Sequence, residues 1–197
     1  GSHDRPRILN VLAGNDGSDI PRDQRAHHRL SPEERMIGAL REQLMLRFIF
    51  SVPGMPCIYY GDEAGMEGCA DPFCRRTYPW GHEDAQMLAR YQAMTAMRNA
   101  HPVLRTGECV YLAPCADVLG VIRKNESGRD AFGSQAENAC AVTLINRSAK
   151  EVVVYLTAED VCGAKTLVTD DGQTLSARGG AFSVKVKGLQ GMTGFAE

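Results

Sequence analysis

The 197-residue sequence lacks a long hydrophobic run. Its longest candidate, residues 44–56, is interrupted by Arg47, Ser51, Pro53 and Gly54. A membrane-spanning helix needs about 18 to 20 consecutive apolar residues, and no signal peptide is visible at the N-terminus. We therefore expect no membrane partner.

The sequence also lacks an excess of charge of either sign. Lysine and arginine total 22 against 24 aspartates and glutamates, which gives a formal net charge of -2. This balance excludes a strongly basic nucleic-acid-binding protein and a polybasic membrane anchor. The phosphate loop G-x-x-x-x-G-K, the dinucleotide-binding glycine spacing and the G-x-S-x-G elbow are absent as well. We expect no cofactor and no nucleic-acid partner.

Cysteine is present, but not in a pattern that builds disulfides or zinc sites. The seven cysteines are an odd number and are scattered along the chain, whereas a secreted disulfide scaffold is shorter and evenly paired. Free thiols in a reducing compartment fit better, so we expect a cytoplasmic location. Cys69 and Cys74 lie near His82, but they lack the close C-x2-C pair of a structural zinc site, and we expect no metal.

Composition changes near residue 102 and divides the chain into residues 1–102 and residues 103–197. In the first region, Ser31 and Glu34 form a capping box that predicts a helix over about residues 31–50, and a second apolar stripe predicts a helix over about residues 84–99. Between them, residues 56–60 form a short apolar run that is typical of a buried parallel strand. The order of these elements indicates part of an α/β fold.

The second region is rich in Val, Thr and Gly, with short alternating runs that predict strands. Asp171 and Gly172 form a plausible hairpin turn between residues 166–168 and 174–175. The expected strands are residues 109–112, 118–123, 140–146, 152–156, 165–169 and 181–186. Their number and spacing predict a small antiparallel β-sandwich, so the fold class is α/β plus all-β.

Two acidic segments of the first region could carry chemistry. In the first, the imidazole and carboxylate of His3 and Asp4 could bind vicinal hydroxyls of a sugar; alternatively, Gly1 to His3 are the remnant of a cleaved purification tag. In the second, Asp62 and Glu63 follow the expected strand, at the end where α/β folds keep their active sites. The alternative is that these two acids cap a turn or pair with an arginine.

A third segment, residues 71–80, combines Asp71 and Arg75 with Trp80, the chain's only tryptophan. A carboxylate and a guanidinium can hydrogen-bond sugar hydroxyls from two sides, and an aromatic face can stack on the sugar ring. The alternative is a local salt bridge with Trp80 as an anchor in the core.

Taken together and in this order, three segments resemble the α-amylase family of glycoside hydrolases. They are residues 1–7 (GSHDRPR), 53–66 (PGMPCIYYGDEAGM) and 71–80 (DPFCRRTYPW). The resemblance is closest to the neopullulanase, cyclomaltodextrinase and maltogenic amylase branch, and it is specific over residues 1 to about 102. It also favours His3 as a native residue over a tag remnant.

The resemblance implies that residues 1–102 are the C-terminal portion of a catalytic (β/α)8 barrel and residues 103–197 its C-terminal β-sandwich domain. Residues 56–60 would then be the eighth strand. Asp4 matches the family's transition-state-stabilising acid, and His3 matches its substrate-binding neighbour. Asp71 and Arg75 match a pair that binds a glucose towards the non-reducing end, whereas Asp62 and Glu63 match structural positions.

The activity that the resemblance implies is retaining hydrolysis of α-glucans such as maltooligosaccharides, cyclodextrin, pullulan or starch. Retention needs a nucleophile and an acid/base carboxylate about 5 Å apart, and the family carries them on segments upstream of Gly1. We therefore expect this fragment to be inactive alone. Because a truncated barrel exposes apolar surface, we also expect residues 1–100 either to form a homodimer with a second copy or to be loosely ordered. Glycosyl transfer, or a non-catalytic carbohydrate-binding or structural β-module, remains an alternative.

Overall fold

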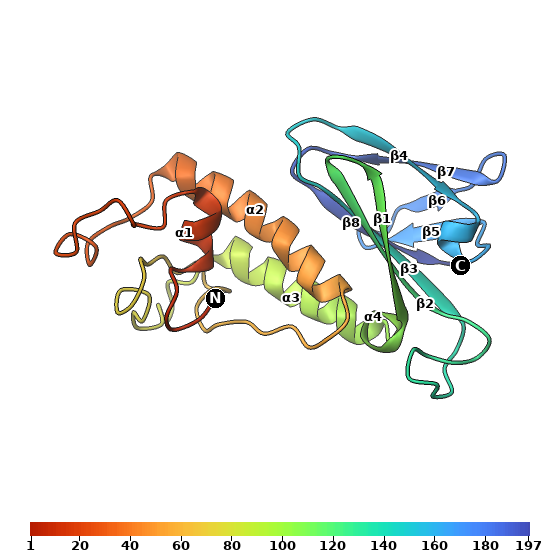
Figure 1. Cartoon of the computed structure of the whole chain (residues 1–197), viewed down its shortest axis with the longest axis horizontal. Helices are drawn as coiled ribbons and strands as arrows, with labels where there is room; N and C mark the ends of the chain where they lie inside the picture. Colours follow the sequence, from red (N-terminus) through yellow and green to blue (C-terminus); the bar gives the residue numbers. More distant parts are fainter. The chain divides into compact units, whose positions relative to one another are not determined.

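The computed structural model describes all 197 residues (Figure 1). The helices are α1 (Ile8–Ala13), α2 (Pro32–Ser51), α3 (Ala85–Ala100), α4 (Val103–Thr106) and the 3-10 turn η1 (Glu159–Val161). The strands are β1 (Glu108–Cys115), β2 (Val118–Asn125), β3 (Ala139–Asn146), β4 (Val152–Thr157), β5 (Thr166–Thr169), β6 (Thr174–Ser176), β7 (Ala181–Val186) and β8 (Gly191–Ala196). None of the helices combines the length and the apolar character that crossing a bilayer requires.

The chain forms two compact units, and each is assembled from separate stretches of sequence. Residues 1–43 and 56–93 make up the first, which we call the helix–loop unit. Residues 44–55 and 94–197 make up the second, the strand unit. The predicted boundary near residue 102 concerns the domains of a longer parent and stays a prediction.

The two long helices begin where the sequence signals predict. At the start of α2, the Ser31 hydroxyl accepts the Glu34 N–H at 3.2 Å, and the Glu34 carboxylate accepts the Ser31 N–H at 2.7 Å. At the start of α3, the Asp84 carboxylate accepts the N–H groups of Gln86 and Met87 at 3.1 and 3.0 Å. These contacts satisfy donors that a helix N-terminus leaves unpaired.

The predicted strand over residues 56–60 is wrong. The structure contains no strand before β1, and the segment is largely exposed, with Cys57, Ile58 and Tyr60 at the surface. A strand exists only through its ladder partners, because isolated extended backbone leaves its N–H and C=O groups unpaired. No other segment of the helix–loop unit is extended alongside this one, so the apolar run remains irregular.

The predicted antiparallel sandwich is confirmed in the strand unit. One sheet has six strands in the order β1-β2-β3-β8-β5-β6, and the other pairs β4 with β7. The predicted hairpin is present, with Leu167 opposite Leu175 and Val168 opposite Thr174, and Gly172 adopts the left-handed conformation that the turn requires. The sequence analysis missed β8, the short helix α4 and η1, and in the helix–loop unit it missed α1.

An apolar core holds the sandwich together. On β7, Phe182, Val184 and Val186 alternate with exposed residues and join a buried cluster with Val142 and Leu144 of β3. On β3 nearly every residue is buried, because its other face is covered as well. There Ala141 packs with Val103 and Leu104 of α4, and the Thr143 hydroxyl meets that of Ser51 at 2.9 Å.

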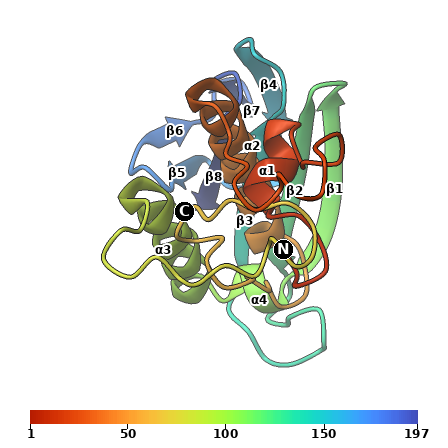
Figure 2. The same cartoon turned by 90° about the vertical axis from the view of Figure 1, so that its left-hand side faces the viewer.

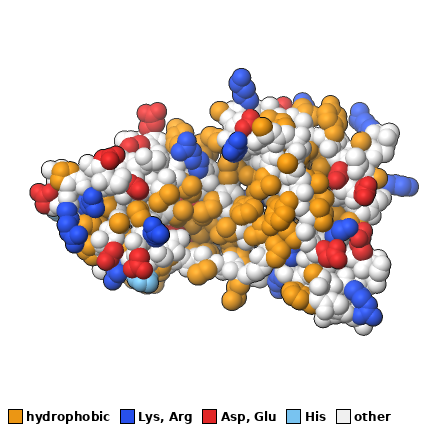
Figure 3. All heavy atoms as spheres, viewed as in Figure 1, with side chains coloured by type: hydrophobic (Ala, Val, Ile, Leu, Met, Phe, Trp, Pro, Cys, Tyr) orange, Lys and Arg blue, Asp and Glu red, His pale blue; other side chains and the backbone are white.

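Apolar side chains also remain at the surface of the strand unit. They gather over the C-terminal half of α2 and the adjoining end of β1 (Figure 3). A hollow of about 580 Å³ there is lined by Leu44, Met45, Phe48, Val118 and Leu119.

Candidate functional site

The four predicted site residues form one cluster in the helix–loop unit. The His3 imidazole lies 3.1 Å from the Asp4 carboxylate. Arg75 joins both acids, since its guanidinium lies 2.8 Å from Asp71 and 3.5 Å from Asp4. Residues about 70 positions apart thus meet, and their roles in catalysis and binding stay predictions.

Backbone contacts reinforce this meeting. The carbonyl of His3 accepts hydrogen bonds from the Arg75 guanidinium at 3.0 Å and from the Cys74 thiol at 3.1 Å. Figures 1 and 2 show the N-terminal segment beside the loop that precedes α3. Because the contact uses a main-chain atom, it fixes the position of the segment independently of the His3 side chain.

The backbone around Gly68 lies close to the N-terminal segment, and this contact places the loop that carries Asp71 and Arg75 beside His3 and Asp4. The Arg7 N–H donates to the Gly68 carbonyl at 2.9 Å, and the Gly68 N–H donates to the Asn10 side chain at 2.8 Å. A Cβ on Gly68 would lie 2.5 Å from the carbonyl oxygen of Phe73. Only glycine fits here without a backbone shift.

Beneath the cluster, Arg7 is almost completely buried. Its guanidinium donates to the Cys74 carbonyl at 2.8 Å, to the Asp62 carboxylate at 3.1 Å and to the Tyr60 carbonyl, and it lies over the ring of Tyr59. Burial raises the pKa of Asp62, and the N-terminal amine, 3.3 Å away, and Arg7 oppose that rise. The interpretation of Asp62 as an acid paired with an arginine is therefore confirmed.

Sequence reasoning did not identify Arg7 as part of the site. Its neighbours Arg5 and Pro6 give a polar context that is typical of surface, and no local pattern marks an arginine for burial. The one signal that could have found it is the buried acid Asp62 downstream, because a buried carboxylate requires a charged partner.

The cluster itself faces solvent. The side chains of His3 and Asp4 are each 65% exposed, and those of Arg75 and Asp71 are 46% and 47% exposed. It therefore presents two carboxylates, a guanidinium and an imidazole to an incoming ligand. Such a set offers donors and acceptors in alternation, which suits a ligand rich in hydroxyl groups.

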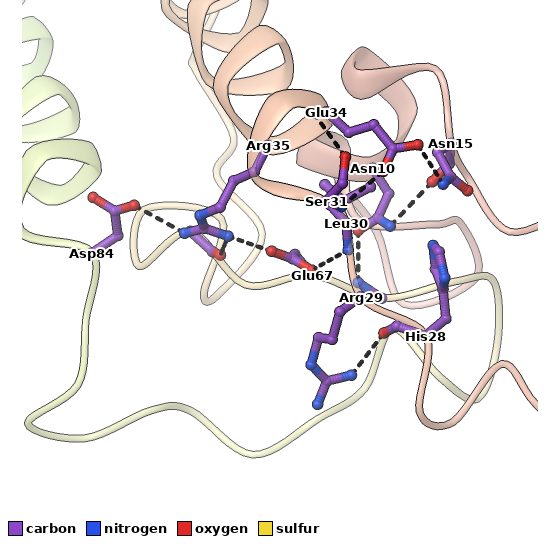
Figure 4. Close-up of polar contacts among 12 residues, drawn as sticks. Asn10, Asn15, His28, Arg29, Leu30, Ser31, Glu34, Arg35, Glu67 and Asp84 are labelled. Atoms are coloured by element: carbon purple, nitrogen blue, oxygen red, sulfur yellow. Dashed lines mark hydrogen bonds and ion pairs between the residues drawn. The ribbon is translucent and has the colours of Figure 1, made fainter.

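A second polar network holds the loops that carry the cluster (Figure 4). Arg35 of α2 bridges Glu67 at 2.5 Å and Asp84 at 2.9 Å. Glu67 also accepts the N–H of Leu30 at 2.9 Å. Burial works against the charge on Arg35, but its hydrogen bonds to both acids raise its pKa overall. This network ties the start of α2 to the start of α3.

The third segment also contains an exposed aromatic side chain. Trp80 is 80% exposed, so the interpretation of Trp80 as a core anchor is wrong. Its ring packs against Tyr78 with centroids 4.5 Å apart and planes at 50°.

No model of a known protein family matches the chain. Among curated proteins, the amylopullulanase of Thermoanaerobacter thermohydrosulfuricus is 33% identical over 192 residues, which is 97% of this chain and 12% of that protein. A cyclomaltodextrinase of Geobacillus thermopakistaniensis is 29% identical over 150 residues, covering 75% of this chain and 20% of that protein. The chain thus spans about an eighth to a fifth of the length of these relatives.

A solved structure is similar in fold. The α-amylase of Geobacillus thermoleovorans, crystallised in complex with acarbose, matches 99% of this chain and 37% of its own chain with a TM-score of 0.74 and 18% identity.

Proposed function

The chain belongs to the α-amylase family of glycoside hydrolases, and from this premise we propose that it is the C-terminal portion of an enzyme that hydrolyses α-glucans with retention. In this proposal residues 1–102 derive from a (β/α)8 barrel, with α2 and α3 as its last two helices. Residues 103–197 are the sandwich domain that follows it.

The observation that supports this most is the convergence of Asp4, His3, Asp71 and Arg75. Asp4 is the proposed transition-state-stabilising acid, because a fixed carboxylate stabilises the positive charge that develops on the sugar ring. His3 lies 3.1 Å from that carboxylate and is proposed to donate to the same sugar. Arg75 and Asp71 are proposed to hold the next glucose towards the non-reducing end.

Arg75 has a positioning role in this arrangement. It contacts both acids and the His3 carbonyl, so it couples the proposed catalytic acid to the proposed sugar-binding loop. A neutral residue at this position would leave Asp4 and Asp71 without their shared cation, and the His3 carbonyl would keep only the Cys74 thiol as a donor from the loop.

The proposal assigns the nucleophile and the acid/base carboxylate to another segment of the parent, in keeping with the small share of each relative that the chain spans. Retaining hydrolysis needs both groups about 5 Å apart. The 197-residue chain alone should therefore give no turnover of a chromogenic maltooligosaccharide. Robust turnover by the purified chain would contradict the proposal.

The decisive experiment uses the full-length parent. Asp4→Asn keeps the shape of the side chain but removes its charge, and we expect kcat to fall by about 1,000-fold or more with an unchanged thermal midpoint. Asp117→Asn is the matched control, because Asp117 is a half-exposed acid of the strand unit paired with Arg147 at 3.5 Å. A near-normal rate for Asp4→Asn would remove this residue from the mechanism.

Two finer points belong to the same proposal. Seven scattered cysteines support a cytoplasmic location, which fractionation of the source cells tests.

The apolar side chains around Leu44, Phe48 and Leu119 support self-association of the isolated chain. Sedimentation as a monomer at all concentrations would contradict the latter.

A further inference from the structure

The loop that carries Asp71 and Arg75 continues into an aromatic pair that the proposed catalytic cluster does not use. Trp80 is 80% exposed, although burying a large aromatic side chain is strongly favourable. The Trp80 ring lies against Tyr78. An exposed indole held by a second ring is available to a ligand with an apolar face.

The pair is held in place by its own loop. The backbone N–H of Trp80 donates to the Tyr78 carbonyl at 3.0 Å, and the backbone N–H of His82 donates to the Pro79 carbonyl at 2.8 Å. Gly81, at φ +76°, allows this tight turn. A ligand would therefore meet a surface that is already ordered.

The residues on either side of Tyr78, Thr77 and Pro79, line a hollow of about 380 Å³ together with His82, Arg29 and Arg76. Glu67 and Asp84 line it as well, whereas Tyr78 and Trp80 do not. The Arg76 guanidinium donates to the carbonyl of Ala26 at 3.0 Å, and that of Arg29 donates to the carbonyl of His28 at 2.7 Å. Both arginines are held by main-chain oxygens and keep further N–H groups for a ligand.

We propose that Trp80, supported by Tyr78, stacks on a glucosyl residue of an α-glucan and forms a binding position beyond the Asp4–Arg75 cluster. The apolar C–H face of the sugar covers the indole, and the arginines and Thr77 of the neighbouring hollow offer hydrogen bonds to hydroxyls of the glucan chain. The inference rests on the proposed function, because that function supplies the substrate class. It adds a specificity-determining residue to the 71–80 loop.

The test uses the intact 197-residue chain and maltoheptaose. Because Trp80 is the only tryptophan, tryptophan emission excited beyond the tyrosine absorption band reports on this ring alone, and we expect a saturable change on titration. By calorimetry, Trp80→Ala should weaken binding about tenfold, and Trp80→Phe should restore part of it. An exposed side chain contributes little to folding, so the thermal midpoint of each variant should match that of the unsubstituted 197-residue chain.

Phe132→Ala is the matched control, because Phe132 is 79% exposed and lies in the strand unit. It should leave both the affinity and the fluorescence change intact. Cellohexaose, a β-linked chain, should bind more weakly than maltoheptaose; equal binding would overturn the assignment to α-glucans.

The outcomes separate this inference from the proposed function. If maltoheptaose binds, Arg75→Ala weakens binding and Trp80→Ala does not, the cluster is a sugar site and the role of Trp80 is overturned. If Trp80→Ala weakens binding and Arg75→Ala does not, the proposed stacking position at Trp80 is supported and the proposed sugar-binding role of the Asp4–Arg75 cluster is contradicted. If calorimetry detects no binding of maltoheptaose at millimolar concentration, the stacking role of Trp80 and the sugar-binding role of the cluster are both contradicted for this chain.

Discussion

The sandwich of the strand unit and the site-forming loops of the helix–loop unit are stabilised by different chemistry. In the strand unit, the sandwich closes over a cluster of apolar side chains such as Leu144, Leu156 and Phe182. In the helix–loop unit, the loops that form the candidate site are joined by a buried guanidinium, that of Arg7, and by the Arg35 network. The apolar cluster depends on volume and shape, whereas the polar network depends on charge and therefore on pH.

This difference suits the two parts of the molecule to different tasks. Apolar packing is non-directional and tolerates any polar surface around it. Hydrogen bonds and ion pairs fix direction as well as distance, and a site that must hold Asp4 and Arg75 in register needs both.

The largest expected effect is in the strand unit. Phe182 is 1% exposed, and Phe182→Ala leaves a cavity in the sandwich core that should lower the free energy of unfolding by about 4 kcal/mol. Amide hydrogen exchange of β3 under native conditions measures the loss. Tyr155→Ala, at a position that is 72% exposed, is the control and should change it by less than about 0.5 kcal/mol. A small effect of Phe182→Ala would mean that the sandwich does not depend on its apolar core.

The next effect is in the helix–loop unit. Arg7→Ala removes the guanidinium that lies 3.1 Å from the buried Asp62 carboxylate and leaves the N-terminal amine, 3.3 Å away, as its charged neighbour. We expect the free energy of local unfolding to fall by about 3 kcal/mol. The amides of α1 should exchange faster, whereas those of β3 should not. The double variant Arg7→Met, Asp62→Leu removes both charges and should recover most of the loss. If the double variant is no better than Arg7→Ala, the damage comes from lost packing and not from an unpaired charge.

The pH dependence separates the two units further. Burial raises the pKa of Glu42 to about 7, against the hydrogen bond that it accepts from Tyr91 at 2.6 Å. Between about pH 4.5 and pH 7, Glu42 therefore keeps its proton in the folded state and has released it in the unfolded state. The stability of the helix–loop unit should then fall as the pH rises from about 4.5 to 7, by roughly 2 to 3 kcal/mol.

The exchange of the α1 amides at pH 5 and pH 7.5 measures this slope, with β3 as the internal reference. Glu42→Gln cannot ionise and should flatten the slope. An equal slope in the variant would assign the pH dependence to other groups, of which Asp62 is the first to examine because burial also raises its pKa.

The smallest effect concerns the start of α2. Ser31→Ala removes the hydroxyl that accepts the Glu34 N–H and should cost about 1 kcal/mol. Ser31→Thr keeps a capping hydroxyl and should cost less. Thermal unfolding followed by circular dichroism compares the two variants. Equal losses would mean that the Arg35 network, and not the cap, fixes the start of the helix.

Local signals predicted the elements whose stabilising contacts are local. Ser31 and Glu34 are three residues apart, and the hairpin at Gly172 needs only its own turn. The strand expected over residues 56–60 failed because a strand requires partners that the local sequence does not specify. The strand β8 was missed because Gly191 and Gly194 weaken the alternation that marks a strand.

The candidate site was predicted in part. The resemblance named Asp4, His3, Asp71 and Arg75, and the structure brings them together. It did not indicate that Arg7 lies beneath them, because burial of an arginine depends on a carboxylate and carbonyls more than fifty residues away. It also left the position of Trp80 open, since an indole serves equally well in a core or on a surface.

The sequence by itself determined the starts of the long helices, the strand content of residues 103–197 and the family to which the chain belongs, because capping pairs, alternation and motifs are properties of neighbouring residues. Only the tertiary structure decided which side chains meet at the candidate site, which charge is buried beneath it and which aromatic ring remains exposed. Those features depend on contacts between distant segments, and the free energy of such contacts exists only once the chain has folded.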